Sequence, residues 1–79
     1  AITIDPSDAD AWNSKGNSLS ALGKYDEAIL SYEQAITIDP SDADAWNSKG
    51  NSLNSLGKSD EAKKCFEKSK ELELADNEY

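Results

Sequence analysis

The sequence predicts an all-α fold, a solenoid of helical hairpins containing about two repeats. Residues 1–19 recur without a change as residues 35–53, a spacing of 34 residues. Apolar residues in each unit follow helical spacings of three and four, and Gly23 and Gly57 each divide two such stretches. Fixed periods of about 20 to 50 residues are typical of units that bury their apolar faces only against their neighbours. We therefore expect one domain whose helices stack in pairs.

Length and charge exclude several classes of function. With 79 residues and a formal net charge of −8, the chain is one small acidic domain that repels phosphate backbones and anionic lipid. No apolar run approaches the roughly 18 to 20 residues that cross a bilayer, and no signal peptide is visible. We expect basic or neutral protein or peptide partners, no nucleic-acid or membrane partner, and a cytoplasmic location by default.

The first helix of each unit is expected to begin just after a proline. In the second unit Ser41 is the predicted N-cap, and Asp44 lies three positions later as in a capping box. Trp46, Gly50 and Leu53 then follow at i, i+4 and i+7, one apolar stripe whose glycine admits the close approach of another backbone. The first unit has the same stripe in Trp12, Gly16 and Leu19.

The second helix of each unit starts again after Gly23 or Gly57, with acidic residues in its first turn. Its apolar positions are small or aromatic, and the small ones suit a close helix crossing. These positions are Ala28, Tyr32 and Ala35 in unit one, and Ala62 and Phe66 in unit two.

The order Trp, Gly, Leu, Gly, Ala, aromatic, Ala, Pro on this period resembles the tetratricopeptide repeat. Lys15 and Lys49 depart from it where a leucine is common, and Ser69 and Leu74 replace the late alanine and proline. We expect the two lysine stems to lie along the hairpins while the ammonium groups reach water or a nearby acid. Unit one carries the pattern at Trp12, Gly16, Leu19, Gly23, Ala28, Tyr32, Ala35 and Pro40.

The two ends of the array are expected to differ. Residues 1–8 form the tail of a preceding unit and a junction, residues 9–42 repeat one, and residues 43–79 repeat two with an extended C-terminal capping helix. The stub at the start leaves an open N-terminal edge. The last helix should be the longest and its outer face polar, as a terminal repeat requires. Here Ile29, Leu30, Ala35 and Ile36 of the first unit become Lys63, Lys64, Ser69 and Lys70.

A polar stripe beside the tryptophans is the candidate binding site. The resemblance implies that these positions line a concave groove and contact peptide ligands. Asparagine amides can both donate to and accept from an extended backbone. The alternative is a merely solvated helix face, although asparagine is a poor helix former for that purpose. The stripe is Asp10, Asn13, Asn17 and Ser20, repeated as Asp44, Asn47, Asn51 and Asn54.

Some relatives of the repeat hold a carboxylate in a clamp of Lys, Asn and Arg. Asn17 and Asn51 match its asparagine, whereas Asn13 stands where its first lysine would be and Asp10 replaces another basic position. The same holds for Asn47 and Asp44. A carboxylate clamp is therefore disfavoured, and the charge sign favours a basic or neutral peptide.

Catalytic and metal sites are not predicted. The chain has no histidine, and Cys65 is its single cysteine, next to lysines that would lower its pKa but without a partnering base. We expect Cys65 to be an incidental surface residue. The alternating acids at Asp39, Asp42 and Asp44 lack the glycine and glutamate of a calcium loop, and helix capping explains them. No catalytic residue, metal or cofactor is expected.

Two functions remain open at this point. The first is a non-catalytic protein–protein interaction module that binds a peptide or partner protein in the groove of the first helices. The alternative is a structural or self-assembling repeat that oligomerises, for example as a homodimer, through its open N-terminal edge.

Overall fold

The computed structural model describes residues 8–76, which form four helices joined by short loops. They are α1 (Ala9–Ala21), α2 (Tyr25–Ile38), α3 (Ala43–Ser55) and α4 (Ser59–Asp76). Within this part of the chain there is no strand, which confirms the all-α fold, and α4 is the longest helix, as expected. The predicted N-terminal stub, residues 1–4, lies outside the described residues. The division into repeats stays a prediction.

Aspartates, not serine, cap the first helix of each hairpin. The Asp42 carboxylate accepts from the backbone N–H of Asp44 at 3.1 Å and of Ala45 at 3.4 Å, and Asp8 caps α1 in the same way. The prediction for Ser41 was therefore wrong by one residue. The Ser41 hydroxyl instead donates to Asp39 at 2.7 Å. A carboxylate also suits the positive end of the helix better than a hydroxyl.

Glycine closes both hairpins in the same way. Gly23 has φ 80° and Gly57 has φ 83°, a left-handed conformation that side chains disfavour. The next N–H, that of Lys24 or Lys58, then donates back to the carbonyl of Leu19 or Leu53 at 2.9 Å. The chain reverses within a few residues, so the second helix of each hairpin packs antiparallel to the first.

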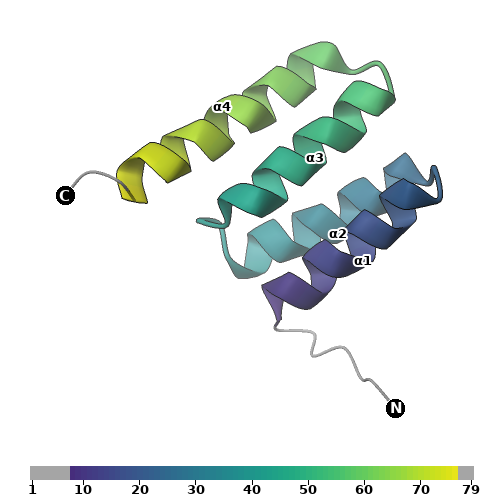
Figure 1. Cartoon of the computed structure of the whole chain (residues 1–79), viewed down its shortest axis with the longest axis horizontal. Coiled ribbons are helices and arrows are strands. Elements are labelled where there is room, and N and C mark those ends of the chain that lie inside the picture. Colours follow the sequence, from purple (N-terminus) through teal and green to yellow (C-terminus); the bar gives the residue numbers. More distant parts are fainter. Residues whose placement is uncertain (1–7, 77–79) are drawn as a thin grey trace.

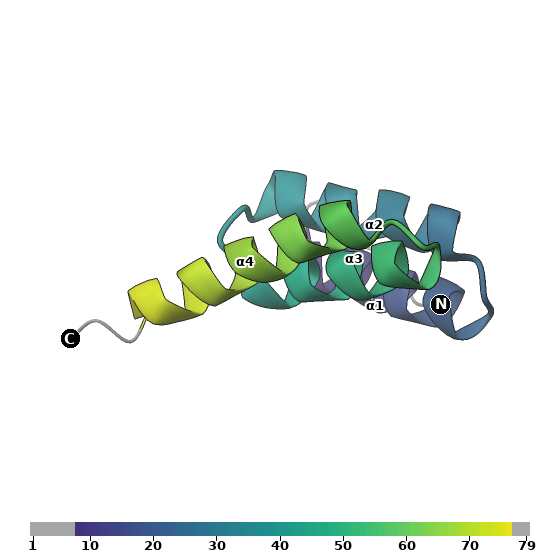
Figure 2. The same cartoon turned by 90° about the horizontal axis from the view of Figure 1, so that it is seen from above.

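The four helices stack in chain order. α1 packs on α2 and α3 packs on α4, while α2 also packs on α3 and so joins the two hairpins (Figure 1). Seen from above, α2 lies on one side of the layer that holds α1 and α3 (Figure 2). Small residues make the close crossings, since Ala28 and Ala62 are 0% and 1% exposed.

Each helical glycine faces an aromatic ring. A Cβ on Gly16 would lie 2.5 Å from Cε1 of Tyr32, and one on Gly50 would lie 2.7 Å from Cε1 of Phe66. The expected close approach is real, but the partner is a side chain of the same hairpin, not another backbone. Glycine is required because the ring fills the volume that any Cβ would take.

The outer face of α4 is mostly polar, although it includes Leu74, which is 56% exposed, and one residue departs from the prediction. Lys63, Lys64 and Lys70 are exposed, whereas Ser69 is buried and its hydroxyl donates to the carbonyl of Ala43 at 2.9 Å. Ser69 therefore faces α3 and does not belong to the outer face, and its counterpart Ala35 is likewise buried. Serine is tolerated there because a backbone acceptor satisfies it.

Candidate functional site

The predicted polar stripe is largely accessible. All four of its α3 members, Asp44, Asn47, Asn51 and Asn54, are exposed. On α1, Asp10 and Asn17 are exposed, whereas Asn13 and Ser20 are half-buried. Among residues 8–76, no hydrogen bond joins the two stripes, so each offers its polar groups separately.

Asn17 is held by a residue from the second helix of its own hairpin. The hydroxyl of Tyr32 donates to Oδ1 of Asn17 at 2.7 Å. Tyr32 is 1% exposed, and this burial raises its pKa, an effect that the nearby hydroxyls of Ser52, Ser48 and Ser20 partly offset. This bond occupies the side-chain oxygen of Asn17 within the protein, whereas its amide nitrogen faces solvent.

Asn51, the copy of Asn17, has a different neighbour. The residue opposite it is Phe66, which has no hydroxyl. Within the described part of the chain, the Asn51 side chain makes no hydrogen bond, so both its donor and its acceptor are available. The two asparagines are equivalent in sequence but not in chemistry.

Asn13 is less available than the sequence suggests. Its Oδ1 is inaccessible to solvent and has no donor within hydrogen-bonding distance among the described residues. A buried acceptor of this kind costs free energy unless it is satisfied. Asn13 therefore contributes less to an open binding surface than its exposed copy, Asn47.

Asp10 and Asp44 open onto one acidic recess of about 400 Å³ at the start of α1 and α3. Asp39 and Asp42 of the intervening loop and Glu73 of α4 complete its charged lining. Despite this density of acids, no three of them converge as a metal site within residues 8–76. The recess has the size and sign to receive a lysine or arginine side chain.

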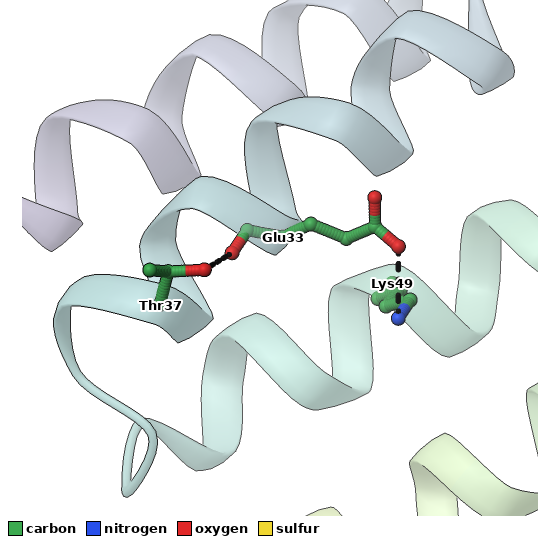
Figure 3. A network of polar contacts seen from close by, with 3 residues as sticks. All are labelled: Glu33, Thr37 and Lys49. Atoms are coloured by element: carbon green, nitrogen blue, oxygen red, sulfur yellow. Dashed lines mark hydrogen bonds and ion pairs between the residues drawn. The ribbon is translucent and has the colours of Figure 1, made fainter.

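The two unusual lysines lie over the tryptophans. The Lys49 ammonium is 5.6 Å from the centroid of the Trp46 ring and 3.2 Å from Oε2 of Glu33 on α2. Figure 3 shows this pair, and the Thr37 hydroxyl that donates to the Glu33 carbonyl at 2.8 Å. Lys15 is 5.1 Å from the centroid of the Trp12 ring. Lys49 thus reaches a nearby acid, as expected.

A second recess, which sequence reasoning missed, lies between α2, α3 and α4. It measures about 580 Å³ and its apolar lining includes Ile29, Trp46, Leu53 and Cys65. On α3 these residues occupy a different face from the asparagine stripe. The only signal in the sequence was the Lys49 substitution, whose ammonium group lies at this recess.

Cys65 contradicts the expectation of a surface residue. It is 4% exposed and packs with Leu53 and Ala62. Burial raises the pKa of its thiol; Lys49 lowers it in part, and Glu61 and Glu33 raise it further. Desolvation of the thiolate is the largest cause of the raised pKa, and the lysine that lowers this pKa is Lys49 of α3, not the adjacent Lys63 or Lys64.

Comparison with protein families now identifies the class. The TPR repeat family matches residues 16–57, more than half of the chain, and tetratricopeptide repeat families also match residues 43–73 and 1–30. The chain belongs to the tetratricopeptide repeat family. None of the described helices is long and apolar enough to cross a membrane. The cytoplasmic location stays a prediction.

Solved structures of MamA resemble the chain in fold. One, described as the crystal structure of MamA, is 35% identical with a TM-score of 0.90 over 95% of this chain and 44% of its own. A second, MamA MSR-1 C2, is 28% identical with a TM-score of 0.88 over 91% and 41%. The chain thus spans less than half the length of these proteins. A comparison with curated proteins returned no match.

These similarities place the chain among protein–protein interaction or scaffold modules, a class that is typically non-catalytic.

Proposed function

We propose that α1 and α3 form a groove that binds an extended basic peptide from a partner protein. The proposed contacts are Asp10, Asn13, Asn17, Ser20, Asp44, Asn47, Asn51 and Asn54. The observation that carries the proposal is the shared recess of Asp10 and Asp44, about 400 Å³ in volume and lined by five carboxylates. The negative charge of these five side chains attracts a cationic side chain into the recess.

The two parts of the groove have different roles in this proposal. A lysine or arginine of the peptide enters the acidic recess, where the carboxylates of Asp10 and Asp44 replace the water it loses. Farther along α3, the exposed amide of Asn51 donates to and accepts from the peptide backbone. The recess therefore selects charge, and the asparagines hold an extended chain.

The test is an NMR titration of the labelled protein with a short arginine-containing peptide. We expect the amide signals around Asp10, Asp44 and Asn51 to shift. A matched peptide with glutamate in place of arginine should cause no shift. Asp10→Asn with Asp44→Asn should weaken binding about tenfold or more, as expected for charged pairs in a partly desolvated site.

A control variant distinguishes binding in the groove from attraction by the overall negative charge of the protein. Asp60→Asn removes one charge at the exposed start of α4, away from the recess. If this variant weakens binding as much as Asp44→Asn does, the attraction is diffuse and the groove is not the site. Loss of helicity in the Asp10 and Asp44 variants, measured by circular dichroism, is the folding check.

A further inference from the structure

The recess between α2, α3 and α4, here called the apolar recess, has no part in the proposed peptide groove. Its volume of about 580 Å³ lies within the range of about 300 to 1,000 Å³ that is usual for small-molecule sites in proteins. Its floor is apolar and includes the buried residues Leu53 and Cys65 and the half-buried residues Ile29 and Trp46. The apolar recess therefore has the size and the lining of a ligand site.

A further hairpin in the array would not fill the apolar recess. Its three walls all come from helices of the described chain. A following hairpin would pack on α4 as α3 packs on α2, where Ile29 lies in the contact. The counterpart of Ile29 on α4 is Lys63, which does not line the recess, whereas its neighbour Lys64 does. The recess thus faces away from the surface that a following hairpin would use.

Two side chains of the wall are held in place by the protein itself. The indole N–H of Trp46 donates to the carbonyl of Pro40 at 3.0 Å. The Lys49 ammonium lies 5.6 Å from the centroid of the same indole ring and 3.2 Å from Oε2 of Glu33 (Figure 3). These contacts orient the wall before a ligand arrives, which lowers the entropy cost of binding.

The charges around the apolar recess cancel. Three carboxylates and three ammonium groups line it, whereas the whole chain has a formal net charge of −8. A charged ligand would be repelled by half of these groups and would lose ionic hydration on entering, and an uncharged ligand has neither cost. The charge balance therefore favours an uncharged ligand. The six groups belong to Asp26, Glu33, Lys49, Lys58, Glu61 and Lys64.

We propose that the apolar recess binds a small uncharged molecule with an apolar body, which lies on Leu53 and Cys65 beside the Trp46 ring. At the mouth of the recess, Leu30 is 62% exposed although its side chain is large and apolar. A bound apolar molecule would remove part of this surface from water. The site uses a different face of α3 from the peptide groove, and neither proposal depends on the other.

The two tryptophans allow a test with an internal control. They stand at matching positions of two identical sequences, and of the two only Trp46 lines the apolar recess. The probe is naphthylmethanol, an uncharged fused-ring alcohol, titrated into the labelled protein and followed by NMR. It should shift the indole N–H signal of Trp46 and the amide signals of Leu53 and Cys65. The indole signal of Trp12 should stay in place.

Matched probes test the preference for an uncharged ligand. Naphthoate and naphthylmethylammonium have the same rings, with a carboxylate or an ammonium group in place of the hydroxyl. Each meets groups of its own charge at the rim and must lose ionic hydration. Each should therefore bind about tenfold more weakly than naphthylmethanol.

Two exposed leucines provide a matched pair of variants. Leu30→Lys gives α2 the residue that α4 has at the matching position, Lys64, and should weaken naphthylmethanol binding about fivefold through lost apolar contact. Leu22→Lys makes the same change at a residue that is 72% exposed and lies outside the recess, and it should leave binding unchanged. Circular dichroism checks that both variants keep their helicity.

Four outcomes would overturn the proposal. The first is that the Trp46 signal does not shift up to the solubility limit of naphthylmethanol. The second is an equal shift of Trp12, which would indicate binding to any accessible indole. The third is a charged probe that binds as tightly as the uncharged one. The fourth is a shift of the Trp46 signal when the protein alone is concentrated, because a second copy would then occupy the recess.

Discussion

The two hairpins have nearly the same first helix and differ in the second, and this difference changes the proposed binding residues. In hairpin one, Tyr32 donates to Asn17 at 2.7 Å. In hairpin two, Phe66 takes the place of Tyr32 and leaves the side chain of Asn51 without a hydrogen bond among the described residues. A residue across the hairpin therefore decides whether the asparagine side chain bonds within the protein or keeps its donor and acceptor free. Repeating a surface sequence does not by itself repeat a binding site.

The second helices also differ because they have different neighbours. α2 is covered by α3, and its Ile29 packs into that contact. α4 has no further helix beside it in the described structure, and Lys63 occupies the matching position. On the buried side, Ser31 of α2 becomes Cys65 of α4, and both are about equally covered at 4% exposure.

Replacing the glycine under each ring should have the largest effect. Gly16→Ala should lower the free energy of unfolding by about 2 kcal/mol and Gly50→Ala by about 1 kcal/mol, after allowing for the better helix propensity of alanine. The order follows because Tyr32 is 1% exposed and hydrogen-bonded, whereas Phe66 is half-buried and can move. Urea unfolding followed by circular dichroism measures both. An equal or larger loss for Gly50→Ala would show that the hydrogen bond does not restrain the tyrosine ring.

Raising the pH should destabilise hairpin two through its thiol. Burial raises the pKa of Cys65 above its ordinary value of 9.0, so the folded state holds this proton more tightly than the unfolded state. Its contribution is complete below about pH 9 and is lost as the pH rises toward the folded-state pKa, at up to about 1.4 kcal/mol per pH unit. Cys65→Ser, which copies hairpin one, should flatten the decline in stability between pH 8 and 10. If Cys65→Ser leaves the slope of stability against pH unchanged, groups other than Cys65 cause the decline.

Exchanging the aromatic residues should have a smaller effect. Tyr32→Phe should cost about 1 kcal/mol, the usual contribution of one hydrogen bond, and should free the side-chain oxygen of Asn17. Phe66→Tyr should have the opposite effect on Asn51, adding stability of about 0.5 kcal/mol while weakening binding of the arginine peptide. Unfolding and the peptide titration are measured on the same two variants. If Phe66→Tyr leaves peptide binding unchanged, the free amide of Asn51 does not matter for recognition.

Local signals in the sequence predicted most of the fold. The glycines and the apolar spacing predicted all four helices, because each of these signals acts within a turn or two of chain, and the 34-residue period showed that the hairpin occurs twice. The N-cap was misplaced by one residue because Ser41 and Asp42 are both good caps, and only the backbone geometry selects between them. The prediction for Ser69 failed because an added hydroxyl group does not show which way a residue faces.

The candidate site was less predictable because it depends on contacts between distant residues. The polar stripe followed from helical spacing, but the bond between Tyr32 and Asn17 spans the hairpin, and nothing local to Asn17 indicates it. The burial of Cys65 and the recess beside it arise where three helices meet. Glu73 likewise joins Asp10 and Asp44 only because α4 folds back along α3.

The length of α4 has a consequence for the acidic recess. After Ser69, which bonds to the first residue of α3, the helix continues to Asp76 and extends beyond the start of α3 (Figure 1). This extension is what brings Glu73 to the acidic recess. The extended end of α4 thus also lines the recess that we propose as one end of the peptide groove. The matching position of the preceding unit is Asp39, just before Pro40, and its carboxylate also lines the recess, so both units place an acid at this point.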